Sequence, residues 1–511
     1  MITLRRLRRG ARRESVGVDV RAATGLLGTN VKYLSGTLLA PTAVAIVYSE
    51  DPLPFLGAGA IGFVSGWSLE RVGRHGTTLG AREGFLVVSF TWLLAAGLCA
   101  LTYLLSGEDQ LSSPVDAYFE SMSGFTTTGA SVLTDIESLD QSLLVWRQLS
   151  QWLGGMGIIV LAIAVLPRLR VGGRQLFESE MPGPEIEQLT ARVRDTARRL
   201  WILYIGLTFV EAVVLSLISV LGVDPALNMF EALTHPLTTM PTGGFSTEAR
   251  SIEAFGAATQ WTIIVFMLIA GANFALMYRS LIRRRPGIVL RDDEFRLYVV
   301  FVAVATTVVA ATLLGDDVLR GEAALRNALF QSVSLMTTTG YASIDYNTWP
   351  LLVLVVLIGL MFVGGSAGST SGSVKVVRHL LMGKILRREL DQTVHPELVS
   401  RIHLNRAAVD ERTLRAITSF LLIYIGLFVV GTLLLVIDAE RIDLDLRLID
   451  AVAAAATTLG NVGPGLGIAG PMGSFEPYSD FSKLVMIALM WLGRLEIVPV
   501  IVLFTRNYWR A

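Results

Sequence analysis

A succession of long apolar runs is the feature that most constrains how this chain can fold. Runs close to the length of a bilayer-spanning helix occupy residues 30–48, 85–105, 143–166, 200–221, 259–282, 296–314, 349–363, 414–437 and 482–505, with a more marginal run at 53–69. A helix needs about 20 apolar residues to cross the hydrocarbon core of a bilayer. Because 52% of the residues are hydrophobic and only 17% are charged, we predict an all-α, multi-pass membrane protein.

The charged residues are sorted along the chain, although its formal net charge is zero. No Lys or Arg occurs between Arg82 and Arg147, whereas basic residues gather near 168–199, 279–291, 378–415 and 506–510. The positive-inside rule places such clusters in the cytoplasm, so we expect a protein of the cytoplasmic membrane with both termini inside. Acidic residues of the first outer segment would concentrate cations at an outer mouth, or would simply keep that surface solvated. They are Glu108, Asp109, Asp116, Glu120, Asp135, Glu137 and Asp140.

Cysteine and histidine give no support for metal or redox chemistry. Cys99, the single cysteine, lies in an apolar run, where a free cysteine usually has a packing role. The five histidines show no ligand spacing, and no nucleophile and base stand out together. We therefore expect no enzyme and no organic cofactor, and we expect membrane lipid but no nucleic acid as a partner.

A fourfold internal repeat lies between the basic clusters. In each unit an apolar span is followed by an outer loop, a helix too short to cross the membrane, a polar glycine turn and a second span. The short helices are predicted at 114–125, 225–238, 322–336 and 446–456, and Ser113-Pro114 and Asp224-Pro225 are expected to begin the first two. Since every unit starts and ends in the cytoplasm, the repeats are parallel and surround an axis along the membrane normal, unlike inverted-repeat symporters.

This repeat sets the predicted domain organisation. We expect pseudo-fourfold pore repeats around a central pore, preceded by a helix hairpin. The ranges are a cytoplasmic tail at 1–29, a hairpin at 30–75, pore repeats at 83–170, 198–286, 294–388 and 414–511, and a cytoplasmic connector at 389–413.

The polar turns at 126–130, 240–245, 337–341 and 459–465 suggest an ion site. Irregular backbone at membrane depth leaves carbonyl groups unpaired unless they are buried in protein or line a wet cavity. Four such turns on one axis would surround a cation with carbonyl oxygens, and threonine could add hydroxyl oxygens. The C-terminal ends of the four short helices would also favour a cation. Taken singly, each turn also fits an ordinary loop.

Several motifs resemble one family of transporters. The stretches 151–157 (QWLGGMG), 178–184 (ESEMPGP), 364–375 (GGSAGSTSGSVK), 461–465 (NVGPG) and 491–496 (WLGRLE) are similar to the Trk/Ktr/HKT superfamily of potassium transporters, most closely to its TrkH-type membrane subunit. The resemblance covers nearly the whole chain after about residue 25. It departs at Ser371-Gly372-Ser373, where the family usually has more glycine.

The resemblance implies potassium uptake through a channel-like pore. In that family each repeat contributes a pore helix and a filter segment, and the filter glycines here would be Gly129, Gly243, Gly340 and Gly463. Potassium would bind to the residues before each glycine, which are Thr127, Thr128, Pro241, Thr242, Thr338, Thr339, Asn461 and Val462.

A run of small polar residues at 364–373 interrupts an apolar span. Such a run disfavours a continuous helix, so we expect a movable loop below the filter. The competing interpretations are a close-packed helix crossing and a nucleotide-binding loop, which lacks its Gly-Lys-Ser/Thr ending. The gating residues would be Gly364, Gly365, Gly368, Ser369, Thr370, Gly372, Lys375 and Arg494.

Arg494 lies well inside the last apolar span. An arginine at the centre of a bilayer costs about 2.5 to 3.5 kcal/mol on insertion scales, so the residue needs a role. We predict that its guanidinium faces the pore below the filter and raises the barrier to ions, in agreement with the pore arginine of the family. The alternative is a structural ion pair with Glu496, although residues two apart on a helix do not face each other.

The resemblance also implies partners. Family members form homodimers and are controlled by a separate cytoplasmic ring of nucleotide-binding subunits. Candidate docking surfaces are 387–415 and 176–199, which also fit solvated connectors. The rival function is a proton- or sodium-coupled symporter, for which Glu211 is the obvious ionisable candidate within a span.

Overall fold

The computed structural model describes residues 18–73, 80–164, 186–281 and 286–510. Throughout these ranges the fold is helical, and the strands are limited to the antiparallel pair β1 (His403–Leu404) and β2 (Ala407–Ala408). Five helices are long and apolar enough to cross a membrane, or up to seven if each bent pair is one span. The all-α membrane architecture predicted from the sequence is confirmed.

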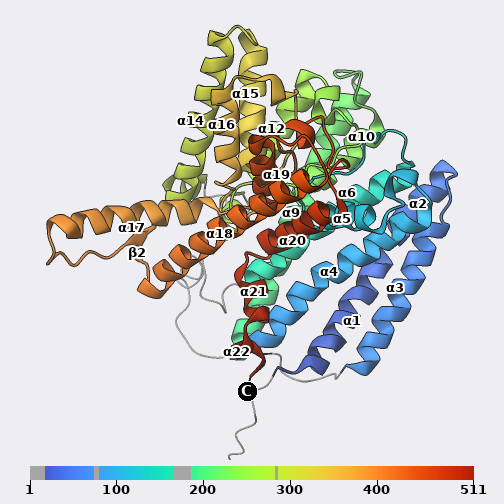
Figure 1. The fold of residues 1–511 in the computed structure, drawn as a ribbon, viewed down its shortest axis with the longest axis horizontal. Coiled ribbons are helices and arrows are strands. Elements are labelled where there is room, and N and C mark those ends of the chain that lie inside the picture. The colour runs from blue at the N-terminus through green and yellow to red at the C-terminus, as the bar shows by residue number, and fades with distance from the viewer. Residues whose placement is uncertain (1–17, 74–79, 165–185, 282–285, 511) are drawn as a thin grey trace, which may run out of the picture.

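The first described elements form a helical hairpin that lies beside the first repeat (Figure 1). Helix α1 (Val20–Thr37) continues into α2 (Leu39–Tyr48), and α3 (Leu53–Val72) returns along α1. A β-carbon on Gly28 would lie 2.4 Å from the carbonyl oxygen of Gly66, so the two helices are in backbone contact. The hairpin starts ten residues earlier than the predicted boundary at 30. Asp19 explains this start, because its side chain accepts a hydrogen bond from Ala22 N (3.0 Å).

Repeat 1 matches its predicted layout. Helix α4 (Ala81–Ser106) leads through an outer loop to the pore helix α5 (Pro114–Phe125), and α6 (Gln141–Ala164) returns. Ser113 occupies the N-cap position and Pro114 the first turn, as expected. The basic residues at 168–174 and the N-terminal residues 1–17 lie outside the described residues.

The pore helix of repeat 2 differs from its prediction. After α9 (Ile186–Val220), the single helix expected at 225–238 is two pieces, α10 (Met229–Thr234) and α11 (Pro236–Thr239). Pro236 has no N–H to donate, which accounts for the break. Asn228, not Asp224, caps α10 by accepting from Glu231 N (2.9 Å), while Asp224 accepts from Gly256 N (2.7 Å). The repeat ends with α12 (Ala257–Ala270) and α13 (Phe274–Leu281).

Repeats 3 and 4 have uninterrupted pore helices. Repeat 3 contains α14 (Asp293–Gly315), the pore helix α15 (Gly321–Met336), α16 (Leu351–Met361) and α17 (Val376–Val394). Repeat 4 contains α18 (Glu411–Arg441), the pore helix α19 (Leu448–Gly460), α20 (Asp480–Arg494), α21 (Val498–Ile501) and α22 (Arg506–Trp509). The pore helix α19 ends four residues beyond the predicted residue 456. Short 3-10 turns lie at Asp109–Leu111, Ser251–Ala254, Pro286–Arg291, Tyr346–Thr348, Gly467–Ala469 and Val502–Phe504.

The second helices of the repeats differ in continuity. Helix α6 runs without a break through its described length, whereas α12 and α13 meet at 102° and α20 and the segment after it meet at 111°. Helices α16 and α17 are separated by the loop 362–375, and α17 extends away from the body together with β1 and β2 (Figure 1). Three of the four repeats therefore bend or open at the same level of the fold.

Candidate functional site

The four polar turns share one backbone pattern at the ends of their pore helices. A left-handed residue is followed by one ordinary residue and then by a left-handed glycine. Positive φ is uncommon outside glycine, so this repetition is specific. We call these segments corner 1 (127–129), corner 2 (242–244), corner 3 (338–340) and corner 4 (461–463). The angles are Thr127 51° and Gly129 83°, Thr242 54° and Gly244 79°, Thr338 58° and Gly340 79°, and Asn461 54° and Gly463 109°.

The corners contact one another in a closed ring. A β-carbon on Gly129 would lie 2.2 Å from the carbonyl oxygen of Gly243, and one on Gly244 would lie 1.9 Å from that of Thr339. A β-carbon on Gly340 would lie 1.9 Å from the carbonyl oxygen of Val462. One on Gly463 would lie 2.6 Å from the carbonyl oxygen of Thr128. Each contact joins one repeat to the next, and the last returns to the first. No residue with a side chain fits at these four glycines without displacing backbone.

Corner 2 corrects the expected register by one residue. We expected Gly243 to be the counterpart of Gly129, but the left-handed glycine that contacts the next repeat is Gly244. The residues that precede it are Thr242 and Gly243, and Pro241 falls outside the corner. The break in the pore helix at Pro236 shifts the end of the turn, and two consecutive glycines let the chain use the second.

The first residues of corners 2, 3 and 4 contact the segment 364–373. The hydroxyl of Thr338 accepts from Gly372 N (2.7 Å), and the hydroxyls of Thr242 and Thr370 are 3.3 Å apart. Among the described residues, Thr127 Oγ1 and Asn461 Oδ1 are buried without a hydrogen-bond partner. Buried oxygens left in this way are costly unless water or a cation completes them. Three hydroxyls and one amide oxygen suit an alkali cation.

A cavity of about 340 Å³ lies beside the ring, lined by residues other than those of the segment 364–373. All four left-handed glycines line it, and its charged lining residues are Arg147 and Glu248. Two of the acidic residues that were expected to attract cations at the mouth of the pore are instead paired with basic residues. Asp116 is paired with Lys483 (2.5 Å), and Glu120 with Arg147 (2.7 Å), because basic residues of the second helices reach both carboxylates.

Glu248 follows corner 2 in the outer loop. Partial burial, followed by the nearby carboxylates of Glu231 and Glu137, raises the pKa of Glu248 to about 7. The side chain therefore changes charge near neutral pH within the cavity lining.

The segment 364–373 is irregular, as predicted, and lies against three repeats. Thr370 Oγ1 donates to the carbonyl oxygen of Met240 (3.0 Å) in repeat 2. A β-carbon on Gly372 would lie 2.3 Å from the carbonyl oxygen of Gly460 in repeat 4, and Gly372 N donates to Thr338 in repeat 3. A helix crossing through this segment is therefore not what the chain adopts.

The remaining residues of this loop hold its shape. Gly364 and Gly368 have φ of 74° and 76°, and Lys375 has 79°. Gly368 O accepts from Phe274 N (3.2 Å), and a β-carbon on Gly365 would lie 2.7 Å from the carbonyl oxygen of Gly271. Ser369 Oγ donates to Ser366 O (2.6 Å), and Lys375 Nζ donates to Ser371 O. The loop thus rests on the break between α12 and α13.

Arg494 ends α20 directly beside this loop. The side chain is 2% exposed, and Nη1 donates to the carbonyl oxygen of Thr370 (2.8 Å). Its Nε and Nη2 atoms have no hydrogen-bond partner among the described residues. The alternative ion pair with Glu496 is not formed, because Glu496 is paired with Arg378. The buried, positively charged guanidinium group of Arg494 therefore contacts the loop that touches the ring.

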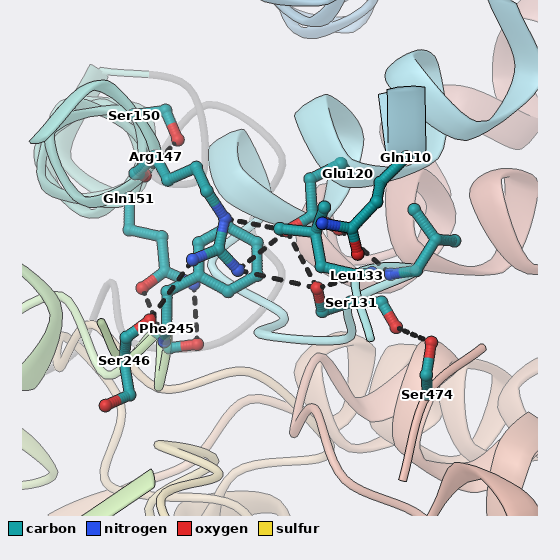
Figure 2. Close-up of polar contacts among 12 residues, drawn as sticks. Gln110, Glu120, Ser131, Leu133, Arg147, Ser150, Gln151, Phe245, Ser246 and Ser474 are labelled. Carbon is teal, nitrogen blue, oxygen red and sulfur yellow. Dashed lines mark hydrogen bonds and ion pairs between the residues drawn. The ribbon is translucent and has the colours of Figure 1, made fainter. Parts of the chain in front are cut away.

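Two residues of α6 at the ring were given no role in the sequence analysis, although Gln151 begins the motif 151–157. Arg147 and Gln151, one helical turn apart, both reach the backbone of repeat 2 (Figure 2). Their spacing of four residues along an apolar span was the available signal, since it places two polar side chains on one face.

Comparison with known proteins agrees with this architecture. The family model TrkH, described as a cation transport protein, matches residues 60–511. The Trk system potassium uptake protein TrkH of Salmonella typhimurium is 39% identical over 501 residues, covering 96% of this chain and 99% of that protein. Trk system potassium uptake protein TrkG of Escherichia coli is 34% identical, covering 96% and 99%.

A solved structure is similar over almost the same length. The crystal structure of the potassium transporter TrkH from Vibrio parahaemolyticus has a TM-score of 0.86 and 34% sequence identity, and the match covers 96% of this chain and 100% of that chain. The chain therefore belongs to the TrkH family of cation transport proteins.

Proposed function

We propose that this protein carries potassium ions into the cell through a channel-like pore whose filter is the ring of four corners. The observation that carries the proposal is the closed contact of the corners, which brings four irregular backbone segments from four repeats to one place. The names of the relatives, which are potassium uptake proteins, support the choice of ion. An ion would leave water in the cavity beside the ring and exchange it for oxygens of the corners.

The ion ligands follow from the ring. We assign them to the carbonyl oxygens of Thr128, Gly243, Thr339 and Val462 at the contacts between corners. The oxygens of Thr127, Thr242, Thr338 and Asn461 would form the inner side of the filter. Gly243 thus enters the site as a ligand and Gly244 as the conformational glycine, and Pro241 leaves it.

We assign the gate to the segment 364–373 and Arg494. The segment touches corners 2 and 3, and Arg494 holds Thr370 from below. A fixed positive charge on the pathway opposes a cation. Arg494→Ala is therefore expected to raise potassium flux about tenfold in reconstituted vesicles, while Arg494→Lys, which keeps the charge, is expected to stay low. Unchanged or lower flux in a monodisperse Arg494→Ala protein would remove its gating role.

The test of the whole proposal compares potassium, rubidium and sodium fluxes in vesicles that contain the purified protein. Flux of potassium and rubidium that exceeds sodium flux, and that continues without a proton or sodium gradient, is expected. No potassium flux under any gradient would reject the function.

A coupled symporter is the second candidate, and one observation favours it. Glu211 of α9 is fully buried, and both carboxylate oxygens are without a hydrogen-bond partner among the described residues. A carboxyl group in such a place could carry a proton. If potassium uptake stops when the proton gradient is collapsed, and Glu211→Gln has the same effect, the symporter is correct.

The remaining proposals concern assembly and placement. We propose a homodimer in the cytoplasmic membrane, with both termini in the cytoplasm and a separate nucleotide-binding regulatory subunit. The relatives' designation as parts of a Trk system supports a further component. The extension of α17 with Leu386 and Val394 exposed (Figure 1) offers a surface for assembly. Light scattering of the protein in detergent would measure its subunit number.

A further inference from the structure

Corner 2 lacks the internal support of corners 1 and 3. In corner 1 the hydroxyls of Thr126 and Thr128 are 2.8 Å apart, and those of Thr337 and Thr339 in corner 3 are also 2.8 Å apart. Repeat 2 has Pro241 and Gly243 at these two places and therefore has no such pair. Its pore helix is also broken at Pro236. Repeat 2 itself supplies two backbone bonds, from Thr242 N to Thr239 O (2.9 Å) and from Gly243 N to Thr238 O (2.8 Å), and one from Thr242 Oγ1 to Pro241 O (2.6 Å). The side-chain support that the threonine pairs give to corners 1 and 3 must come from another repeat.

Gln151 of α6 makes two hydrogen bonds to corner 2. Its Nε2 donates to the carbonyl oxygen of Gly243 (2.7 Å), and its Oε1 accepts from Phe245 N (3.1 Å). The amide also fills the space beside Gly243, since a β-carbon there would lie 2.4 Å from Gln151 Cδ. A carbonyl oxygen has two lone pairs, so the oxygen of Gly243 can accept from Gln151 and still bind an ion.

Arg147 holds the other end of the same segment. Its Nη1 donates to the carbonyl oxygen of Ser246 (3.1 Å), and its guanidinium carbon is 4.2 Å from the ring centroid of Phe245. The side chain is 1% exposed and is oriented by Glu120, which accepts from Arg147 Nε (2.9 Å). Figure 2 shows Arg147 and Gln151 side by side on one helix, pointing at the segment with Phe245 and Ser246.

Glu120 ties this arrangement to repeat 1. It accepts from Ser131 Oγ (3.0 Å) and Val132 N (3.0 Å), just beyond corner 1. The contacts thus connect the residues after corner 1 with the backbone of corner 2. Since α6 is unbroken in its described part, it is a rigid base for both side chains.

We propose that Gln151 and Arg147 are positioning residues that set potassium over sodium selectivity by fixing corner 2. The inference rests on the proposed function. Gln151 fixes the direction and field of one ligand carbonyl, and Arg147 keeps the following backbone from relaxing. Loss of these contacts leaves one quarter of the ring free to close around a smaller ion, so sodium gains more than potassium.

The experiment measures potassium and sodium fluxes in vesicles for full-length variants. Gln151→Leu removes both hydrogen bonds, and Gln151→Glu keeps the shape but removes the donor to Gly243. Each is expected to lower the potassium to sodium ratio about fivefold, as the loss of a buried hydrogen bond implies. Arg147→Lys keeps the charge beside Glu120 but loses the forked geometry, and a smaller fall of about twofold to threefold is expected.

Gln148→Leu is the matched control. Gln148 is a buried glutamine on the same helix, and its amide atoms have no hydrogen-bond partner among the described residues. The ratio of Gln148→Leu is expected to equal that of the wild type. Monodisperse Gln151→Leu and Gln151→Glu proteins with a wild-type ratio would overturn the proposal, as would an equal fall in Gln148→Leu.

A binding measurement covers variants that do not transport. Potassium bound by the folded protein raises its Tm, and we expect potassium to raise the wild-type Tm more than sodium does. The Gln151 variants are expected to lose this difference, and its retention would overturn the proposal. Gly340→Ala separates the two hypotheses. If it conducts like the wild type, the filter itself is wrong; if it fails while the Gln151 variants stay selective, only the role of Gln151 and Arg147 is wrong.

Discussion

Corners 1 and 3 each contain a pair of threonine hydroxyls, whereas corners 2 and 4 lack this pair and depend in part on side-chain contacts with another repeat. Corners 1 and 3 end in Thr-Thr-Thr-Gly, and two threonine hydroxyls of each turn form a hydrogen bond with each other. Corner 2 depends on α6 of repeat 1. In corner 4, Asn461 Nδ2 donates to Thr128 Oγ1 (3.0 Å) and to Met490 O (2.9 Å). Equal backbone geometry is thus reached with local hydroxyl pairs in two repeats and partly through contacts between repeats in the others.

The largest expected effect breaks a corner that contains a threonine pair. Gly340→Ala places a β-carbon 1.9 Å from the carbonyl oxygen of Val462, at a φ of 79°. Neither backbone can yield without opening the ring, so potassium flux is expected to fall at least about a hundredfold, which corresponds to about 2.7 kcal/mol. Rubidium uptake into vesicles would measure it. Flux within about twofold of the wild type would show that corner 3 does not line the pathway.

A smaller loss of flux is expected when the substituted glycine lies in a corner that depends on another repeat. At Gly243 the new β-carbon meets the side chain of Gln151 rather than backbone, with Cδ at 2.4 Å. A side chain can turn aside, at the loss of its two hydrogen bonds, so Gly243→Ala is expected to lower flux only about tenfold. The same rubidium assay compares the two variants. A greater loss for Gly243→Ala than for Gly340→Ala would contradict the comparison.

Removal of one hydroxyl tests the internal support of corner 3. Thr339→Val keeps the shape of the side chain but removes the hydrogen bond between the hydroxyls of Thr339 and Thr337 (2.8 Å), while Thr337 Oγ1 keeps its bond to Val333 O (2.8 Å). One lost neutral hydrogen bond is expected to lower the potassium to sodium ratio about threefold. Thr306→Val in α14, whose buried hydroxyl has no hydrogen-bond partner among the described residues, is the control and is expected to leave the ratio unchanged. An unchanged ratio in Thr339→Val would mean that the pair does not support the corner.

The smallest effect concerns the charge beside corner 2. The pKa of Glu248 is raised to about 7, so this carboxyl is neutral below that pH and charged above it. Potassium flux at low salt is expected to rise about twofold as the pH increases through 7, because one charge in the cavity lining acts through water on the proposed pathway. Glu231, Glu137 and Arg147 lie near the same cavity. Glu248→Gln should abolish the pH step, and a persistent step would assign it to another group.

The sequence predicted what local chemistry decides. The threonine-glycine turns and the apolar spans between them predicted the four repeats. Helix α5 has the predicted bounds. The register of corner 2 was wrong because Gly243 and Gly244 are equally able to adopt positive φ. The choice between them depends on Thr339 of repeat 3 and Gln151 of repeat 1, which no local pattern contains.

Ion pairs between residues far apart in the chain were the second feature that the sequence did not predict. Asp116 and Lys483 are 367 residues apart, and their ion pair turns an expected surface charge into a partly buried, paired one. The early start of α1 was missed because its packing against α3 replaces the long apolar run that the prediction required. The ion ligands and the gate remain predictions, which the flux measurements above test.

The contact between Asn461 and Thr128 joins residues 333 positions apart, and this has a consequence for biosynthesis. A ribosome delivers corner 1 long before corner 4, and until then the first polar turn lies in the membrane without its neighbour. Exposed backbone polar groups are costly there, so the early repeats must be shielded by the insertion machinery or by one another. In the proposed pore, the ring of corners is complete only once the last quarter of the chain has been inserted, so a partly synthesised protein would not conduct.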